Sequence, residues 1–329
     1  MTRAIVARAP TRLDFGGGWT DVPPYTEREG GAVCSVAITR YATATAALDE
    51  RAARRAGAPA PADDALTAAA LRRSGIPGAV AHVTADFPAG AGLGGSSTCG
   101  VALAGALALL RGEHLAPNEL ASLSRATEVE ELGVVGGYQD HYAAAYGGAL
   151  LLGFAECASV EMLSFPEQTA DDLVRRSVLL YTGESRLSGS TVAAVRDAYL
   201  AGNSRTVAAL ARIKALAGEM ASAVRSGDVD GLGRLVGEHW VHQRALHPTI
   251  TTPRIEAIVE RASRAGALGT KALGASGGGC VLAIAAEGRE EELARAIAPL
   301  GERLDFAIDW DGFQVMAVLD ERHDDEHAG

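Results

Sequence analysis

The chain has 329 residues, of which 48% are hydrophobic and 22% are charged, and this is the composition of an ordinary soluble globular protein with about two domains. Its formal net charge is −11, from 30 basic and 41 acidic residues. This acidic balance excludes a general binder of nucleic acid or of anionic membranes, because such proteins need a basic surface. An anionic small molecule held by a few local arginines is still compatible with it.

The cysteines and the N-terminal segment indicate a cytoplasmic protein. The cysteines lack C-x-x-C spacing, which argues against zinc and disulfides and favours buried free thiols in a reducing cytosol. They are Cys34, Cys99, Cys157 and Cys280. The start "MTRAIVARAPTRLDF" lacks the apolar core of a signal peptide, and the longest apolar run, "GVALAGALALL", is too short to span a bilayer. We therefore expect no association with a membrane.

The first half of the chain is expected to alternate strands with helices. A strand over residues 4–9 leads into the loop "RLDFGGGWTDVPPY" (12–25), whose glycines and prolines favour neither a strand nor a helix. Taken alone, this loop is either a surface turn or a close backbone approach to a ligand. One or two β-branched strands follow over residues 32–50, then a helix-containing surface insertion over 51–79 and a strand over 79–87.

Helices and a closing strand complete this half. A glycine-rich loop over residues 88–98 precedes a helix of small residues over 99–111, and Pro117 starts the next helix. The segment "VVGGYQD" then leads into a helix over 141–148, and "ALLLGF" (149–154) is the closing strand.

The second half has the order β-α-β-β of a split α/β sandwich. The segment "SVLLYTG" is a buried strand, helices fill residues 190–245, and "PRIEAIVERASRAG" is a further helix. A glycine loop precedes the strand "CVLAIA", and "LDFAID" and "QVMAVL" are expected to pair as a hairpin through the "WDG" turn. We predict an N-terminal domain over residues 1–160, a C-terminal domain over 161–320 and a disordered tail over 321–329.

The loop 88–98, "PAGAGLGGSST", is the strongest functional signal in the sequence. It joins a strand to a helix, so its backbone N–H groups and the helix N-terminus favour a phosphate. Ser96 and Ser97 add hydroxyls that can cap the helix, contact phosphate or bind Mg²⁺. The loop has neither the P-loop pattern nor the acidic residue that follows a dinucleotide fingerprint, and a purely structural turn is the alternative.

Two carboxylates and a second glycine loop are further candidates, each with a simpler alternative. Asp140 in "GGYQDH" either caps the following helix or points into a cleft as a base. Glu128 either binds a metal in that cleft or belongs to the solvated run "EVEE". The loop "GASGGGC" (274–280) is either a tight turn or a ligand loop. Lys271 before it is one of only two lysines, and its alternative is a solvated side chain on a helix-to-strand connection.

In this order, the opening loop, "PAGAGLGGSST", "GGYQD" and "KALGASGGG" resemble the signature motifs of the GHMP kinase superfamily, named for galactokinase, homoserine kinase, mevalonate kinase and phosphomevalonate kinase. The likeness spans nearly the whole chain. Within the superfamily, "RAPTRLDFGGGWTDV", "GYQDHYAAAYGG" and "LLYTGESR" are similar first to the D-glycero-D-manno-heptose 7-phosphate 1-kinases and next to the fucose-kinase-like sugar 1-kinases. The resemblance implies a two-domain α+β fold, with a ribosomal-S5-like N-terminal half, a ferredoxin-like C-terminal half and a cleft between them.

The resemblance also implies roles for individual residues. Asp140 matches the catalytic carboxylate, and Arg12 matches a basic residue beside the reacting hydroxyl. Glu128 and Ser96 match the Mg²⁺ ligands, and an extra glycine in the loop leaves Ser97 as the alternative. The implied ATP-binding residues are Pro88, Gly90, Gly92, Leu93, Gly94, Gly95, Ser96 and Ser97. The implied substrate-binding residues are Gly17, Gly18, Trp19, Thr20, Asp21, Arg186, Lys271, Gly277 and Gly278. Galactokinases carry G-E-H-T-D where this chain has "GGWTD", which argues against galactose as the substrate.

The function implied by the resemblance is ATP-dependent and Mg²⁺-dependent phosphorylation of the anomeric hydroxyl of a sugar phosphate, a heptose 7-phosphate. The distal phosphate needs a local cationic group in a chain of net charge −11, and Arg186 is the first candidate, ahead of Lys271 and Arg244. The alternatives are a fucose-kinase-like 1-kinase on a free sugar, a mevalonate- or homoserine-type kinase, an inactive sugar-binding homologue and, last, a Rossmann-type oxidoreductase. A homodimer is left open.

Overall fold

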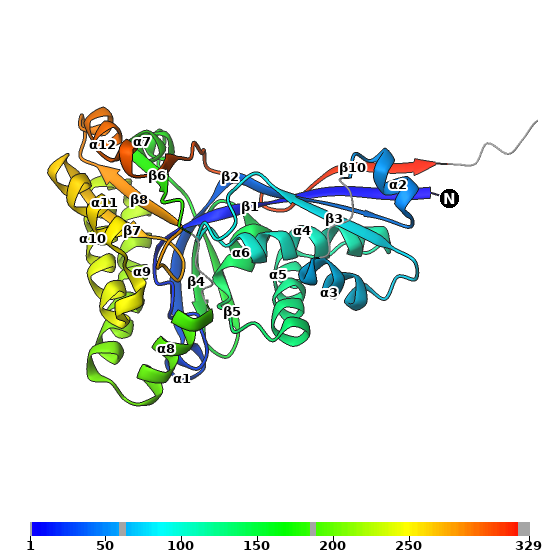
Figure 1. Ribbon diagram of the computed structural model, residues 1–329, viewed down its shortest axis with the longest axis horizontal. Coiled ribbons are helices and arrows are strands. Elements are labelled where there is room, and N and C mark those ends of the chain that lie inside the picture. Colours follow the sequence, from blue (N-terminus) through cyan, green and yellow to red (C-terminus); the bar gives the residue numbers. More distant parts are fainter. Residues whose placement is uncertain (1, 59–63, 185–188, 322–329) are drawn as a thin grey trace, which may run out of the picture.

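The structure is a computed structural model that describes residues 2–58, 64–184 and 189–321 (Figure 1). Its described residues form two antiparallel sheets, one of six strands and one of four, with helices packed against both. This arrangement confirms the α+β class that the sequence predicts. In Figure 1 the first sheet runs along the long axis of the molecule, and the second sheet lies at the end opposite the N-terminus.

Two long neighbouring strands form the centre of the first sheet. β1 (Thr2–Gly16) pairs with β2 (Gly31–Ala47) from Ala4↔Ala47 to Gly16↔Cys34. The other strands are β3 (Val80–Ala85), β4 (Ala149–Phe154), β5 (Ala158–Leu163) and β10 (Gln314–Glu321), in the order β10-β1-β2-β4-β5 with β3 also on β2. The predicted loop 12–25 is therefore a strand as far as Gly16. A β ladder, and not a loop, fixes Arg12 and Asp14.

Helices of the N-terminal half pack on this sheet or on one another. They include α1 (Tyr25–Glu29), α2 (Glu50–Arg55), α3 (Ala65–Ser74), α4 (Gly95–Leu110), α5 (Pro117–Ala126) and α6 (Gln139–Tyr146). α4 is almost wholly buried and packs on both β1 and β2, and its alanines and glycines allow helix and sheet to approach closely. At its first turn the Thr98 hydroxyl donates to the Pro10 carbonyl oxygen at 3.3 Å. This contact places the start of α4 beside the middle of β1.

The second sheet shares a hydrophobic core with the first. Its strands are β6 (Ser177–Tyr181), β7 (Ala267–Ala272), β8 (Cys280–Ala285) and β9 (Glu302–Arg303), in the order β7-β8-β6-β9. The helices of the second half of the chain include α7 (Thr169–Arg176), α8 (Gly189–Leu200), α9 (Ser204–Ser226), α10 (Val229–Leu246), α11 (Pro253–Arg264) and α12 (Glu290–Ile297). Phe15 of β1, Met220 of α9 and Leu282 of β8 belong to one buried cluster. The two sheets are thus joined by packing as well as by the chain.

The predicted C-terminal hairpin is wrong. β10 pairs with β1, from Thr2↔Glu321 to Arg8↔Gln314, and does not pair with residues 304–309. At the turn, the carboxylate of Asp309 accepts hydrogen bonds from the N–H groups of Asp311 and Gly312 at 3.1 and 2.8 Å. The turn chemistry is as the sequence suggests, but the open edge of β1 takes the strand that follows. The predicted boundary at residue 160 stays a prediction, and residues 322–329 of the predicted tail lie outside the described residues.

Two smaller expectations also need correction. Residues 267–272 form strand β7, where the sequence suggested only a connection between a helix and a strand. Cys157 is exposed and Cys99 is half-buried, whereas Cys34 and Cys280 are buried as expected. Among the described residues, no helix is both long enough and apolar enough to cross a membrane.

Candidate active site

A cavity of about 590 Å³ lies where the motifs of the sequence meet. Its walls come from the end of β1 with residues 18–22, the loop that leads into α4, residues 134–140 at the start of α6, and residues 273–278 between β7 and β8. These segments are far apart in the sequence and belong to both sheets. Segments of the N-terminal and C-terminal halves therefore face one space, and the charged side chains that line it come from the N-terminal half.

The glycine loop before α4 has backbone that only glycine accepts readily. Gly90, Gly92 and Gly94 have φ values of 69°, 74° and 77°, in the left-handed region. A Cβ atom on Gly92 would lie 2.7 Å from the carbonyl oxygen of Leu273, so the loop packs directly on the second glycine loop. Behind the loop, α4 presents its first-turn N–H groups, which have no partner within the helix. This is the geometry that binds phosphate.

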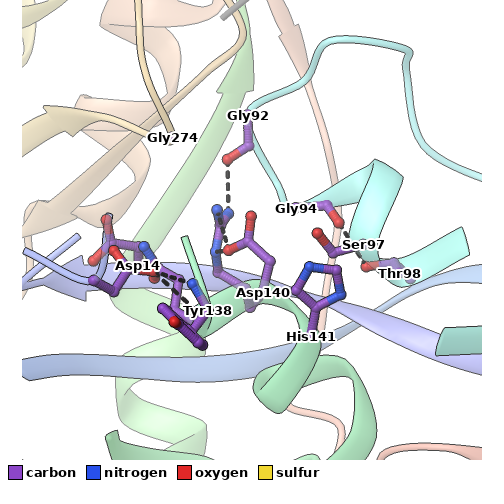
Figure 2. A network of polar contacts seen from close by, with 12 residues as sticks. Asp14, Gly92, Gly94, Ser97, Thr98, Tyr138, Asp140, His141 and Gly274 are labelled. Carbon is purple, nitrogen blue, oxygen red and sulfur yellow. Dashed lines mark hydrogen bonds and ion pairs between the residues drawn. The ribbon is translucent and has the colours of Figure 1, made fainter. Parts of the chain in front are cut away.

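Asp140 and Arg12 form an ion pair beside this loop. Arg12 Nε donates to Asp140 Oδ1 at 2.7 Å, and Arg12 Nη1 donates to the carbonyl oxygen of Gly92 at 2.7 Å. The Arg12 side chain is 3% exposed and that of Asp140 is 27% exposed, so Arg12 is fixed while Asp140 keeps access to the cavity. Figure 2 shows Asp140 at the centre of the polar network, between Asp14 on one side and Ser97 on the other.

Asp21, and not Asp140, caps helix α6. Asp21 Oδ2 accepts hydrogen bonds from the backbone N–H groups of Tyr138 and Gln139 at 2.8 and 3.0 Å, whereas Asp140 lies in the first turn and binds Arg12. Burial raises the pKa of Asp21 to about 6, against the lowering effect of these hydrogen bonds. The alternative interpretation of Asp140 as an N-cap is therefore wrong.

Glu128 is a buried side chain and not part of a solvated charge run. It lies on a short π-helix (Thr127–Glu131) that turns its carboxylate inward. Ser96 Oγ donates to Glu128 Oε1, and His141 Nε2 lies 3.2 Å from Glu128 Oε2. Burial opposes the charge of Glu128, but the contacts with His141 and Ser96 outweigh it and lower its pKa. Ser97 Oγ donates to the same carboxylate at 3.3 Å, so both serines adjoin it.

The Glu128 carboxylate and the Ser96 hydroxyl together are suitable ligands for Mg²⁺. Mg²⁺ prefers oxygen donors and is commonly held by one or two carboxylates together with substrate phosphates. Ser96 and Glu128 supply such donors at the start of α4, where phosphate is expected. Among the described residues, no group of three or more His, Cys, Asp and Glu side chains is arranged to hold a metal alone. Phosphate oxygens would have to complete the coordination.

The structure brings most of the predicted residues to the cavity but not all. The predicted residues that line it are Arg12, Gly18, Trp19, Asp21, Pro88, Gly90, Gly92, Gly94, Gly95, Ser96, Ser97, Glu128, Asp140 and Gly278. Leu93, Gly17, Thr20, Gly277 and Lys271 do not line it. The Thr20 hydroxyl instead donates to the Gly17 carbonyl oxygen at 2.7 Å and shapes the loop from behind. Arg186 lies outside the described residues.

Lys271 is neither solvated nor in contact with the cavity. Its side chain is fully buried on β7, and Nζ lies 3.1 Å from Asp14 Oδ2. Arg244, a lesser candidate for a phosphate contact, lies at the surface in an ion pair with Glu256. Neither side chain is placed to bind a ligand in the cavity.

Several lining residues were missed by the sequence analysis. Asp14 and Gln139 line the polar end of the cavity, and Phe87, Val134 and Val135 line an apolar part. The signal for Asp14 was a carboxylate within an otherwise apolar strand pattern, "RLDFGG". Val134 and Val135 gave no signal beyond being apolar residues in a loop.

Comparison with known proteins agrees with this geometry. Residues 64–148 match the family of GHMP kinase N-terminal domains, and residues 220–301 match that of GHMP kinase C-terminal domains. The crystal structure of a D-glycero-D-manno-heptose 1-phosphate kinase from Bacteroides thetaiotaomicron shares the fold, with a TM-score of 0.74, 24% identity and coverage of 98% of this chain and 100% of that chain.

Two curated relatives show the extent of the likeness. The L-fucokinase/L-fucose-1-P guanylyltransferase of Bacteroides fragilis is 28% identical, over 94% of this chain and 38% of that protein. The D-glycero-alpha-D-manno-heptose 7-phosphate kinase of Campylobacter jejuni is 32% identical, over 60% of this chain and 58% of that protein. The chain thus spans less than two thirds of the length of either relative. With both terminal domains matched in order along the sequence, the chain belongs to the GHMP kinase superfamily.

Proposed function

We propose that the protein is an ATP-dependent kinase that phosphorylates the anomeric hydroxyl of a sugar phosphate, a heptose 7-phosphate. One observation carries the kinase assignment: Asp140, held by Arg12, stands beside a phosphate-binding glycine loop in a single cavity. The likeness to the heptose 7-phosphate kinase of Campylobacter jejuni supports the choice of sugar.

The residues of the cavity suit phosphoryl transfer, which depends on positioning and charge neutralisation more than on covalent catalysis. The N–H groups of the glycine loop and the N-terminus of α4 would hold the triphosphate. Phe87, Val134 and Val135 would contact the base at the apolar part of the cavity. Bound Mg²⁺, held by Ser96 and Glu128, would neutralise phosphate charge.

Asp140 would act on the acceptor hydroxyl. Its carboxylate is the partly exposed member of the ion pair, so it can accept a hydrogen bond from that hydroxyl and orient or deprotonate it. Arg12 holds the carboxylate in place through the ion pair, and its guanidinium lies next to the glycine loop, where charge on the transferred phosphoryl group would develop.

One observation favours a second candidate, a fucose-kinase-like enzyme that acts on a free sugar. Among the described residues that line the cavity, Arg12 is the one Lys, Arg or His side chain, and it is already bound to Asp140 and Gly92. A distal phosphate would therefore depend on Arg186, which the structure does not describe. The likeness to the fucokinase of Bacteroides fragilis covers nearly the whole of this chain.

The test is a screen for ADP formation with ATP and Mg²⁺ over L-fucose, D-mannose, D-galactose, a heptose, its 7-phosphate and mevalonate. We expect turnover with a sugar and none with mevalonate, and loss of reducing-sugar reactivity in the product would locate the phosphate at C1. The Asp140→Asn variant should lose about 10²- to 10⁴-fold in kcat while still binding ATP. The control Asp305→Asn removes an exposed carboxylate outside the cavity and should behave as wild type. Near-normal kcat in Asp140→Asn would refute the assignment of Asp140.

A further inference from the structure

The polar end of the cavity contains buried polar atoms that have no partner. Asp14 Oδ1, Asp21 Oδ1, Gln139 Oε1 and Trp19 Nε1 are all buried without a hydrogen bond, and all four residues line the cavity. Each of these residues is at least nine-tenths buried. Because buried polar atoms in native proteins are nearly always hydrogen-bonded, such a cluster at a cavity indicates a ligand that supplies the partners.

The carboxylate of Asp14 is held rigidly by one of its oxygens. Lys271 Nζ donates to Asp14 Oδ2 at 3.1 Å, to the Asp14 carbonyl oxygen at 2.9 Å and to the Phe15 carbonyl oxygen at 3.3 Å. These contacts use all three donors of the ammonium group. A Cβ atom on Gly18 would lie 2.4 Å from Asp14 Oδ2, so the loop closes tightly over the pair. Oδ1 is the one oxygen of the carboxylate left without a partner.

The chemistry of this end favours hydroxyl groups and disfavours phosphate. Asp14 and Asp21 present carboxylate oxygens, which accept hydrogen bonds and repel anions. Gln139 adds an acceptor and Trp19 adds a donor. A neutral group with several hydroxyls, each able to donate and accept, would satisfy such a set.

We propose that Asp14 is a substrate-positioning residue, whose Oδ1 accepts a hydrogen bond from a hydroxyl of the sugar while Asp21 Oδ1 accepts another. Lys271 fixes the Asp14 carboxylate and balances its charge without touching the substrate. The polyhydroxylated, unphosphorylated part of the acceptor lies at this end of the cavity. The inference rests on the proposed function, because the acceptor must be a sugar for the cluster to be satisfied in this way.

The experiment compares Asp14→Asn with wild type, using the sugar that the wild-type enzyme phosphorylates best in the screen. We expect KM for the sugar to rise about 10- to 100-fold, as for the loss of a hydrogen bond to a charged group, while KM for ATP is unchanged. Calorimetric titration of the sugar, without ATP, should show the same loss of affinity. Asp305→Asn is the matched control and should show neither effect.

Because Asp14→Asn leaves Lys271 buried without its counter-ion, the double variant Asp14→Asn/Lys271→Met is made alongside it. Circular dichroism and Tm report whether each variant folds. A monodeoxy series of the same sugar, measured with wild-type enzyme, gives a third measurement that needs no variant. For one deoxy sugar, the loss of affinity for the wild-type enzyme should equal the loss that Asp14→Asn shows with the complete sugar. The affinity of that deoxy sugar should then be the same for wild type and for Asp14→Asn.

The outcomes separate this inference from the proposed function. If the wild-type enzyme phosphorylates a sugar and a folded Asp14→Asn variant has an unchanged KM for that sugar, the inference is overturned and the kinase assignment stands. The inference is equally overturned if no single deoxygenation of the sugar raises KM by about tenfold. A wild-type protein that neither binds nor phosphorylates any sugar of the screen overturns the proposed function and this inference with it.

Discussion

Asp21 and Asp140 lie at the same end of helix α6, yet their surroundings give them different properties. Asp140 is partly exposed and its carboxylate is paired with the Arg12 guanidinium. Asp21 is buried beneath the first turn, where two backbone N–H groups only partly offset the cost of burying its charge. The Asp140 carboxylate is thus accessible from the cavity, whereas the Asp21 carboxylate is buried and holds the start of the helix.

The raised pKa of Asp21 predicts how stability depends on pH. Its pKa of about 6 in the folded state lies above the ordinary value of 3.8, so the folded state binds this proton more tightly than the unfolded state. The resulting stabilisation is complete below pH 4 and is lost as pH rises through 6. Between pH 5 and 7.5, wild type should therefore lose about 1 kcal/mol more unfolding free energy than Asp21→Asn. Urea denaturation at both pH values measures this, and parallel profiles for the two proteins would contradict it.

Glu128 offers a test of the metal site. Replacing Glu128 by Gln keeps the volume but removes the charge that its neighbours hold in the ionised form. We expect the Mg²⁺ concentration for half-maximal rate to rise by at least about tenfold, as is typical when the surroundings of a bound metal are perturbed. The matched control is Glu130→Gln, at an exposed glutamate on the same π-helix. If both variants need the same Mg²⁺ concentration as wild type, Glu128 is not a metal ligand.

At the scale of elements, the two glycine loops form one packed unit. Gly92 and Gly274 are in contact, since a Cβ atom on Gly274 would lie 3.0 Å from Gly92 Cα, and Cys280 N donates to the Ala91 carbonyl oxygen at 2.7 Å. The loop before α4 is therefore shaped by the C-terminal half as well as by its own glycines. A phosphate site built in this way depends on the docking of the two halves.

This packing predicts an unequal effect of two similar substitutions. Gly92→Ala places a Cβ atom 2.7 Å from the Leu273 carbonyl oxygen at a φ of 74°, so the loops must separate. Gly112→Ala has a similar φ of 87° with nothing within 4 Å, and it carries only the backbone strain. We expect Gly92→Ala to raise KM for ATP and to lower the unfolding free energy by about 1–3 kcal/mol, more than Gly112→Ala does. Equal ATP affinity in the two variants would show that the contact is not needed for nucleotide binding.

The sequence predicted the elements whose determinants are local. The helix that starts at Pro117, the strand "CVLAIA" and the glycine-rich loop before α4 all follow from residue type and spacing. Strand β7 did not, because "ALGTKA" contains a lysine whose burial depends on partners far away in the sequence, above all the Asp14 carboxylate 257 residues away. The pairing of β10 with β1 was also missed because it depends on distant parts of the chain. Whether a strand has an open edge is a property of the folded sheet and not of a local sequence pattern.

The residues of the candidate site likewise fall into those that the sequence identified and those whose placement depends on tertiary contacts. Asp140, Arg12 and the glycine loop could be named because motifs retain residue type and order. Glu128 was named with them, but its burial could not be derived from the run "EVEE", which has the same residues whether it is solvated or packed inward. Nor could the exclusion of Lys271 from the cavity, since a lone lysine beside a glycine loop has the same sequence whether it contacts a ligand or a buried carboxylate.

At the scale of the molecule, the cavity combines the carboxylates of Asp14 and Asp21 with a glycine loop whose geometry suits phosphate, in a chain of net charge −11. In the proposed kinase, ATP would bring its charge to this loop, where backbone N–H groups, the α4 terminus and bound Mg²⁺ would neutralise it. A second phosphate, on the acceptor, has no such group among the described residues. Whether the acceptor carries one is therefore the property that separates the two candidate functions.

Arg186 provides the decisive comparison. If the acceptor is a heptose 7-phosphate, Arg186→Ala should raise its KM and leave KM for ATP unchanged, because a guanidinium binds phosphate through paired hydrogen bonds that alanine cannot replace. Arg244→Ala, which removes a surface arginine paired with Glu256, is the matched control and should change neither constant. The free heptose should also be a much poorer substrate than its 7-phosphate with wild-type enzyme. Equal kcat/KM for the two sugars would instead mean that the cavity recognises hydroxyls alone, and the enzyme would then be a 1-kinase of free sugars.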